Sequence, residues 1–174
     1  MQLTLSVLIS QNDMRTFVSE SEFDTWGRTR RLVYPDGEVV DFAYNHAGNL
    51  TSMQGRKSAR KYPIITRQGY DERENRVYRK YGNGTEQVLD YEPLRNHLTN
   101  SRVELNGVKL LDNAYKYDDV DNILSIVNSA NIPDFGLGGS YSHSYQYDDL
   151  NRLVSASGEA ETPELKNSYS LAMK

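Results

Sequence analysis

Short runs that alternate apolar and polar residues make up most of this chain. In the opening run LTLSVLI (residues 3–9), apolar residues alternate with Thr and Ser except at Leu8, and EVVDFAY (residues 38–44) places Val40, Phe42 and Tyr44 on one face. A period of two is typical of a strand with one buried face. The runs are rich in Val, Tyr, Thr, Leu and Ile, which strands favour. No long helical stripe interrupts them, so the pattern predicts an all-β chain.

Three tight turns separate pairs of these runs. Pro35-Asp36-Gly37 lies between RTRRLVY and EVVDFAY, Gly82-Asn83-Gly84 between NRVYRKY and TEQVLDY, and Asn106-Gly107 between NSRVEL and VKLLDNAYKY. Pro-Asp-Gly and Asn-Gly sequences between β-rich runs are strong signals of a β-hairpin. The sequence therefore predicts a series of antiparallel hairpins.

A second kind of turn, which we call the motif turn, recurs six times at intervals of 21 to 30 residues. Each copy has an aromatic residue at a strand end and then an Asp, Asn or Glu, whose side chain can bond backbone N–H groups two residues on. The six pairs are Phe23-Asp24, Tyr44-Asn45, Tyr70-Asp71, Tyr91-Glu92, Tyr117-Asp118 and Tyr147-Asp148. Such self-similarity indicates a repeat architecture, in which one hairpin unit recurs and packs on its neighbours.

The residue three positions after the acidic or amide residue is expected to need a positive φ. Gly27 and Gly48 suit this position, and Asp121 and Asn151 hold it in later copies, as non-glycine residues that tolerate the left-handed region. Glu74 and Arg95 fit poorly, so looser turns are expected there. Gly37 and Gly84 in the other turns are also expected to have positive φ.

Composition favours an open sheet over a compact globule. The apolar fraction is 37% and the mean hydropathy is −0.71, both low for a two-layer domain. An antiparallel sheet covered on one face, or curved around a wet interior, needs fewer apolar residues. The 13 tyrosines suit such a half-exposed sheet. We expect about five to six hairpins in a curved sheet.

Charge argues against nucleic acid as a partner, because the net charge of −4 is spread along the chain with no broad basic footprint. One basic cluster, residues 56–61 (RKSARK), is interpreted as a solvated loop between hairpins, with an anion-binding patch as the alternative. Cysteine is absent, which rules out disulfides and thiolate metal sites. No apolar run reaches the roughly 18 residues of a membrane span.

We expect three regions: leading strands at 1–22, the hairpin array at 23–157, and a loop with a truncated terminal strand at 158–174. Residues 129–140 and 158–166 are expected to be loops. Neither end looks like a polar capping unit, so the sequence is expected to be an excerpt from a longer array.

The motif turns resemble the YD repeat of the Rhs family, which includes Rhs polymorphic toxins, the B and C components of insecticidal Tc toxins, and teneurins. The resemblance rests on stretches such as FDTWGRTRRLVYPDGEVVDFAYNHAGNL, YDDVDNILSI and YDDLNRLVSASG, which together with the other copies cover residues 23–157. It implies a hollow β-shell that encloses or presents a C-terminal toxin or effector. The implied partners are the remaining repeats and that effector, and the implied location is secreted or at the cell surface.

Most residues that would otherwise suggest catalysis or metal binding are accounted for by their places in turns and strands. Asp118, Asp121 and Asp148 lie at turn positions, the three histidines lack ligand spacing, and alternation along a strand separates His143 from its flanking serines. We therefore expect no catalytic, cofactor or metal site. The alternative is an adhesion, carbohydrate-binding or protein-binding module that uses exposed tyrosines such as Tyr78, Tyr115 or Tyr145. Packing of the motif tyrosines on adjacent hairpins is favoured, because they recur at strand ends.

Overall fold

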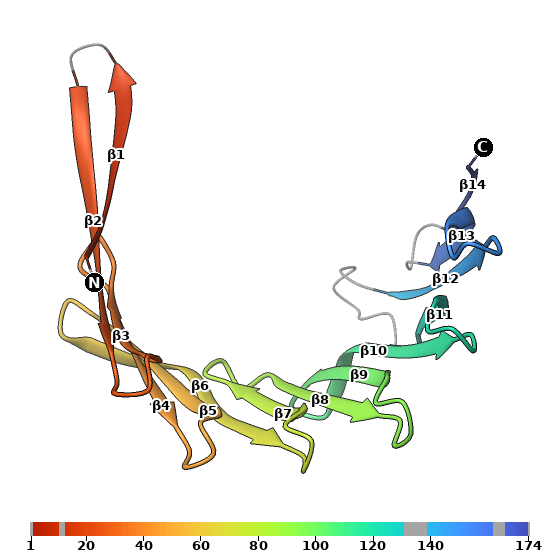
Figure 1. Ribbon diagram of the computed structural model, residues 1–174, viewed down its shortest axis with the longest axis horizontal. Coiled ribbons are helices and arrows are strands. Elements are labelled where there is room, and N and C mark those ends of the chain that lie inside the picture. The colour runs from red at the N-terminus through yellow and green to blue at the C-terminus, as the bar shows by residue number, and fades with distance from the viewer. Residues whose placement is uncertain (1, 11–12, 131–138, 162–165, 174) are drawn as a thin grey trace. The chain divides into compact units, whose positions relative to one another are not determined.

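The computed structural model describes residues 2–10, 13–130, 139–161 and 166–173, with backbone alone for residues 2–10, 13–15 and 166. These residues form strands joined by turns (Figure 1). They divide into two compact units, residues 1–84 and 85–174. No helix that could cross a membrane occurs in this part of the chain.

The first unit contains seven strands among its described residues. They are β1 (Gln2–Ser10), β2 (Asp13–Phe23), β3 (Thr29–Val33), β4 (Val39–Tyr44), β5 (Leu50–Lys57), β6 (Arg60–Tyr70) and β7 (Arg76–Tyr81). Each strand pairs with the next one along the chain, and every pair is antiparallel. The unit is therefore a meander of hairpins.

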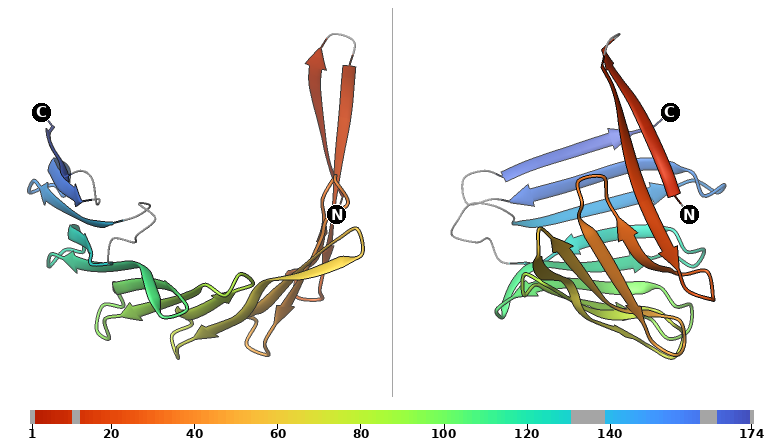
Figure 2. Two further views of the ribbon diagram at one scale, coloured as in Figure 1. Left: turned by 180° about the vertical axis from the view of Figure 1, so that it is seen from behind. Right: turned by 90° about the vertical axis from the view of Figure 1, so that its left-hand side faces the viewer.

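The second unit has the same organisation. Its described strands are β8 (Glu86–Tyr91), β9 (Leu98–Leu105), β10 (Val108–Tyr117), β11 (Ile123–Asn128), β12 (Ser140–Tyr147), β13 (Leu153–Glu161) and β14 (Lys166–Ala172). Successive strands again pair antiparallel, and the right-hand view of Figure 2 shows β12, β13 and β14 side by side. The predicted all-β array of antiparallel hairpins is confirmed.

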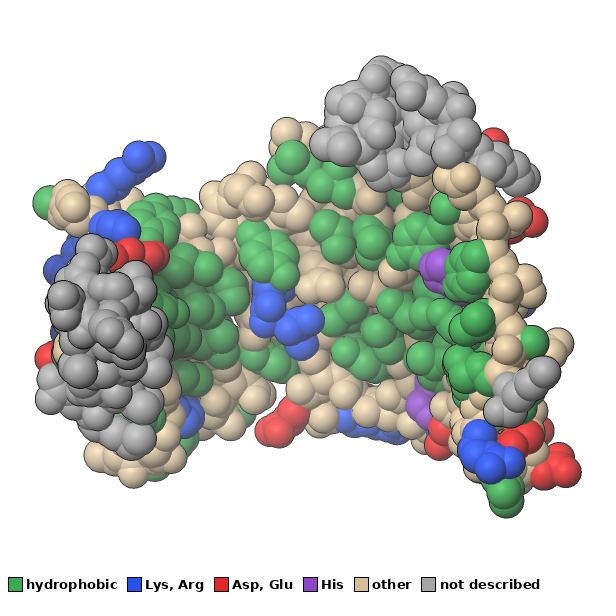
Figure 3. Space-filling view, turned by 90° about the horizontal axis from the view of Figure 1, so that it is seen from above, with side chains coloured by type: hydrophobic (Ala, Val, Ile, Leu, Met, Phe, Trp, Pro, Cys, Tyr) green, Lys and Arg blue, Asp and Glu red, His purple; other side chains and the backbone are tan. Residues whose placement is uncertain are grey.

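Each unit is a single layer, so burial is limited. The buried apolar side chains are few among the described residues: Val40, Ile65, Leu89, Ala130 and Ala156. Hydrophobic side chains gather on the face seen in Figure 3. A sheet with little core of its own must be held by strand pairing and by contacts between turns.

Two of the expected loops are wrong in whole or in part. The basic cluster at 56–61 is the end of the β5–β6 hairpin, in which Ser58 and Ala59 form a two-residue turn between the paired Lys57 and Arg60. Both turn residues have positive φ, 47° and 64°, without the Asn-Gly signal that predicts such a turn. The expected loop at 158–166 is shorter, because β13 continues to Glu161 and β14 begins at Lys166.

The expected loop at 129–140 falls mostly outside the described residues. Ser129, Ala130 and Gly139 are described, whereas residues 131–138 are not. Strand β12 begins at Ser140.

Candidate functional site

Five motif turns share one backbone geometry. In the Phe23 copy, the N–H of Asp24 donates to the Arg28 carbonyl at 2.9 Å, and Gly27 donates back to the Asp24 carbonyl at 3.0 Å. The Tyr44, Tyr70, Tyr117 and Tyr147 copies repeat both bonds. The residue in the Gly27 position has a positive φ in each: Gly27 77°, Gly48 93°, Glu74 65°, Asp121 74° and Asn151 59°. Gly37 and Gly84 have φ of 81° and 89°, so positive φ is confirmed at all four predicted glycines.

The Asp side chain of a motif turn stabilises the turn by accepting hydrogen bonds from residues within it. Asp118 Oδ1 accepts from the N–H groups of Val120 at 3.0 Å and Asn122 at 2.8 Å, and its Oδ2 accepts from the Asn122 amide at 2.9 Å. The same three contacts occur at Asp24, Asp71 and Asp148. Asn45 accepts from the Asn49 N–H at 2.8 Å. The position four residues after each of these Asp residues therefore has a role that the sequence reading missed: its Arg or Asn side chain satisfies the second carboxylate oxygen.

These contacts favour the ionised carboxylates. A hydrogen bond from the Asn122 side chain, followed by backbone N–H groups, lowers the pKa of Asp118 below its usual 3.8. The Arg152 guanidinium does the same for the pKa of Asp148, and Arg28 for that of Asp24. Asp71 shows the same direction of pKa change, with Asn75 as its main cause. Acids held in this way are structural anchors whose oxygens are already occupied.

The Tyr91 copy departs from this pattern and corrects one expectation. Glu92 donates to the His97 carbonyl at 2.8 Å and Asn96 donates to the Glu92 carbonyl at 3.0 Å, so this turn has one residue more than the others. Asn96, with φ of 62°, takes the left-handed position that was assigned to Arg95. Asn tolerates that conformation better than Arg. The longer Glu92 side chain accepts from the N–H groups of Leu94 and Arg95 at 2.5 and 2.7 Å.

The looser turn expected at Glu74 is also wrong. Glu74 donates to the Asp71 carbonyl at 3.2 Å, within the range of the other copies. The Asp71 anchor compensates for the unfavourable residue.

Four motif tyrosines hydrogen-bond to the preceding motif turn. Each lies at the end of a strand, and its hydroxyl donates to the first carbonyl of the neighbouring strand, where the chain leaves the previous turn. The pairs are Tyr44 to Thr29 at 2.8 Å, Tyr70 to Leu50 at 3.0 Å, Tyr117 to Leu98 at 2.9 Å and Tyr147 to Ile123 at 3.0 Å. These bonds fix the spacing between repeats.

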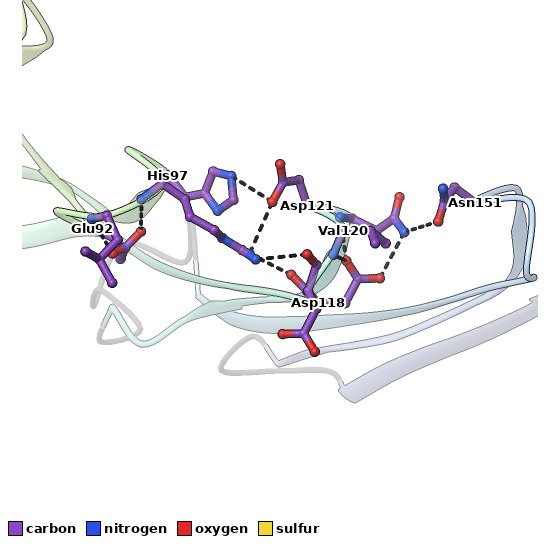
Figure 4. Close-up of polar contacts among 10 residues, drawn as sticks. Glu92, His97, Asp118, Val120, Asp121 and Asn151 are labelled. Atoms are coloured by element: carbon purple, nitrogen blue, oxygen red, sulfur yellow. Dashed lines mark hydrogen bonds and ion pairs between the residues drawn. The ribbon is translucent and has the colours of Figure 1, made fainter.

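Side chains also connect one motif turn to the next. In the second unit, Arg95 donates to the carbonyls of Asp118 at 2.6 Å and Asp119 at 3.1 Å, and pairs with the Asp121 carboxylate at 3.2 Å (Figure 4). His97 Nε2 lies 3.3 Å from the same carboxylate, and its ring stacks on Tyr117 with centroids 4.5 Å apart. The next step is a bond of 3.0 Å from Asn122 to Asn151.

An arginine plays the connecting role in the first unit. Arg28 pairs with Asp24 at 2.6 Å, and its guanidinium lies 4.5 Å from the Trp26 ring centroid and 4.4 Å from that of Tyr44. Stacking of a guanidinium on two aromatic rings adds to the ion pair. One arginine thereby joins two motif turns.

The other turns form as predicted. Pro35-Asp36-Gly37 closes with Gly37 donating to the Tyr34 carbonyl at 2.9 Å, and Gly84 donates to the Tyr81 carbonyl at 3.0 Å in the turn that contains Gly82 and Asn83. Asn106 and Gly107 have φ of 52° and 81° between the paired Leu105 and Val108. Two successive positive φ values are typical of the type I′ hairpin turn.

Sequence reasoning also missed a buried polar network at the base of the 129–140 segment. Asp112 in β10 accepts from Asn100 at 3.0 Å, from Lys109 at 2.6 Å and from Ser129 at 3.3 Å. The Lys109 ammonium, with Asn100, lowers the pKa of this carboxyl. Asn128 accepts from the backbone N–H of Asp112 at 2.8 Å and donates to the Gly139 carbonyl at 2.9 Å. The network joins Ser129 and Gly139, at the two ends of that segment, to β10 and β11. The sequence feature that could have predicted the network is the polar pair Asp112-Asn113, which follows the apolar residues Leu110 and Leu111.

The described residues bring together no group of side chains suited to catalysis or metal binding. Their His, Asp and Glu side chains form no group of three suited to a metal ion. His143 Nδ1 lies 2.9 Å from the Tyr169 hydroxyl rather than near Ser142 or Ser144, which lie on the opposite face of β12. The carboxylates considered for catalysis are engaged in the turns or, as with Asp121, in ion pairs.

Comparisons with known proteins agree with this geometry. The RHS Repeat family profile matches residues 23–59. No curated protein is significantly similar in sequence. Among solved structures, TcdB2-TccC3-Cdc42 superposes with a TM-score of 0.80 at 19% identity over 98% of this chain. TcdB2-TccC3 superposes with a TM-score of 0.80 at 24% identity over 91% of this chain. The Photorhabdus luminescens Tc holotoxin pore superposes with a TM-score of 0.70 at 19% identity over 98% of this chain.

This chain spans only a small part of those proteins: 11% of the first and third chains and 9% of the second. At such identities the similarity establishes the fold, and the profile match locates the family's repeat within residues 23–59. The turns, the tyrosine bonds and the fold agree with that match. Residues 23–59 thus match the RHS Repeat profile, and the chain has the antiparallel β-fold seen in part of the TcdB2-TccC3 structures.

Proposed function

We propose that this chain forms part of the wall of a β-shell in an Rhs-type protein, and that the shell encloses or presents a C-terminal toxin or effector domain. In this proposal residues 23–157 are the wall-forming array, residues 1–22 lead into it and residues 158–174 continue it. Its partners are the remaining repeats of the parent protein and the effector. The family resemblance supports a location of the parent protein outside the cell or at its surface.

The series of tyrosine hydroxyl bonds carries the proposal. Because each of these four bonds joins a motif turn to the one before it, successive repeats within each unit are held together without a central core. Few side chains are buried in either unit. Such a construction suits a thin wall.

A wall is favoured over an adhesion or carbohydrate-binding module because of where the tyrosines point. The four bonded hydroxyls are turned towards neighbouring strands and are not offered to a ligand. Tyr115 and Tyr145, which were considered for recognition, are half-buried. The described residues give no observation that favours a glycan partner.

The test is protease protection of the C-terminal domain in the parent protein. We expect that domain to resist digestion, and to become accessible when Tyr44, Tyr70, Tyr117 and Tyr147 are all replaced by Phe. Tyr34→Phe with Tyr145→Phe is the control, since neither hydroxyl has a hydrogen bond to any side chain or backbone group that the structure describes. Equal digestion with and without this segment would show that the segment encloses nothing.

A further inference from the structure

The end of the β5–β6 hairpin concentrates positive charge. We call residues 56–61 the β5–β6 end. Arg56 pairs with Lys61 across the two strands and Lys57 pairs with Arg60, and all four side chains are exposed. Strand β4 covers this hairpin only as far as Val39, which pairs with Arg56. Two cross-strand pairs of like charge therefore lie at the tip of the hairpin.

This arrangement costs stability. Like charges directly opposite each other on neighbouring strands repel. The turn itself holds Ser58 and Ala59 in the left-handed region, at φ of 47° and 64°, which is unfavourable for residues with a Cβ. Local conflicts of this kind are expected where a segment serves something other than folding.

One face of the β5–β6 end already binds carboxylates within the chain. Lys57 Nζ lies 2.6 Å from Asp36 Oδ2, and the Tyr62 hydroxyl donates to the Glu38 carboxylate. The two acids are two residues apart on the neighbouring segment. Hydrogen bonding to Asp36 raises the pKa of Lys57, and Lys57 lowers the pKa of Asp36. Lys57 is thus one cation of this hairpin end that binds a carboxylate within the chain.

On the opposite face of the β5–β6 end, the cationic side chains have no carboxylate partner among the described residues. Side chains alternate along a strand, so Arg56 and Lys61 point away from the face that carries Lys57 and Tyr62. Asp41, the acid on the β4 side of that face, is bound to Arg31 at 2.7 Å. Neither Arg56 nor Lys61 has an ion pair with any residue that the structure describes.

We propose that the Arg56–Lys61 face of the β5–β6 end binds an extended acidic segment of a partner protein, with carboxylates two residues apart. Residues i and i+2 of an extended chain present side chains on the same face, about 7 Å apart. Arg56 and Lys61, as directly opposed residues, have Cβ atoms about 5 Å apart, and their long side chains can reach two such carboxylates. Ser58 and Ala59 at the tip provide no large apolar side chain for insertion into a membrane. This inference is independent of the proposed wall function.

The test is fluorescence anisotropy with a labelled ten-residue peptide in which Glu alternates with Thr, and with a second peptide that has Gln in place of Glu. We expect the Glu peptide to bind at least about tenfold more tightly than the Gln peptide, with affinity falling as salt rises. Arg56→Gln with Lys61→Gln should weaken binding about tenfold. Because that variant loses a destabilising like-charge pair, its circular dichroism should match that of the wild type and its melting temperature should not fall.

The control is Arg30→Gln with Lys116→Gln, which removes the same charge from exposed cations away from the hairpin end. It should change binding less than about twofold. Equal weakening by the two variants would show non-specific charge attraction and overturn the proposal. Binding of phosphatidylserine vesicles in place of the Glu peptide, or equal affinity for the two peptides, would also overturn it.

Discussion

Gly158 is a position at which a single added methyl group should destabilise the sheet. It lies in β13, paired with His143 on one side and Tyr169 on the other. The Tyr169 ring crosses over Gly158, and its hydroxyl lies 2.9 Å from His143 Nδ1. A Cβ at residue 158 would lie 2.5 Å from Tyr169 Cε1, 2.6 Å from His143 Nδ1 and 2.8 Å from the Ser142 carbonyl oxygen. Gly158→Ala must therefore displace the ring or the strand.

The expected cost follows from these contacts. Overpacking of this kind costs about 1–3 kcal/mol, and loss of the histidine–tyrosine hydrogen bond adds about 1 kcal/mol. The lower chain entropy of Ala in the unfolded state offsets about 0.4–1 kcal/mol. The net expectation is a destabilisation of roughly 1–3 kcal/mol, localised to β12–β14.

Gly69→Ala is the matched control, since Gly69 also lies opposite a tyrosine, Tyr78. Its Cβ would meet Tyr78 Cβ at 3.5 Å, an ordinary contact. That substitution should be neutral or stabilising by about 0.4–1 kcal/mol. Hydrogen exchange read by mass spectrometry reports each unit separately, as repeat arrays open locally. Wild-type protection of β12–β14 in Gly158→Ala, or an equal loss in Gly69→Ala, would refute the reasoning.

Four further predictions follow from the turns. Tyr117→Phe removes the bond to the Leu98 carbonyl and should cost about 1 kcal/mol in urea unfolding, whereas Tyr145→Phe, which loses no hydrogen bond, should cost little. Gly48→Val at φ of 93° should destabilise its turn by about 1 kcal/mol or more, and wild-type melting would contradict the turn assignment. Ser58→Asn with Ala59→Gly should raise the melting temperature by relieving left-handed strain, and an unchanged value would count against that strain. Folding lowers the carboxyl pKa of four turn residues, Asp24, Asp71, Asp118 and Asp148, so these carboxylates stabilise the folded state above pH 3.8 and lose that effect as the pH falls through their pKa values in the folded state. The melting temperature followed by circular dichroism should therefore decline over that acidic range. The decline should be less steep in Asp118→Asn with Asp148→Asn.

The sequence by itself determined the features that depend on a few neighbouring residues. A motif turn closes within five residues, and its acid, its left-handed residue and its strand ends are adjacent in the chain. Their identities therefore predicted the turn geometry at Gly27, Gly48, Asp121 and Asn151, and the antiparallel hairpins between the turns. The same local logic predicted the Asn106-Gly107 turn.

Only the tertiary structure decided which strands and side chains meet across the sheet. The tyrosine hydroxyl bonds span 15 or more residues, and the pairing of Gly158 with Tyr169 depends on the register of β13 and β14. Strand pairing also made a hairpin end of residues 56–61, and the extra residue in the Tyr91 turn moved the left-handed position from Arg95 to Asn96. A shift of one residue in pairing turns every side chain to the other face, so these contacts follow from the packed strands and not from any local sequence.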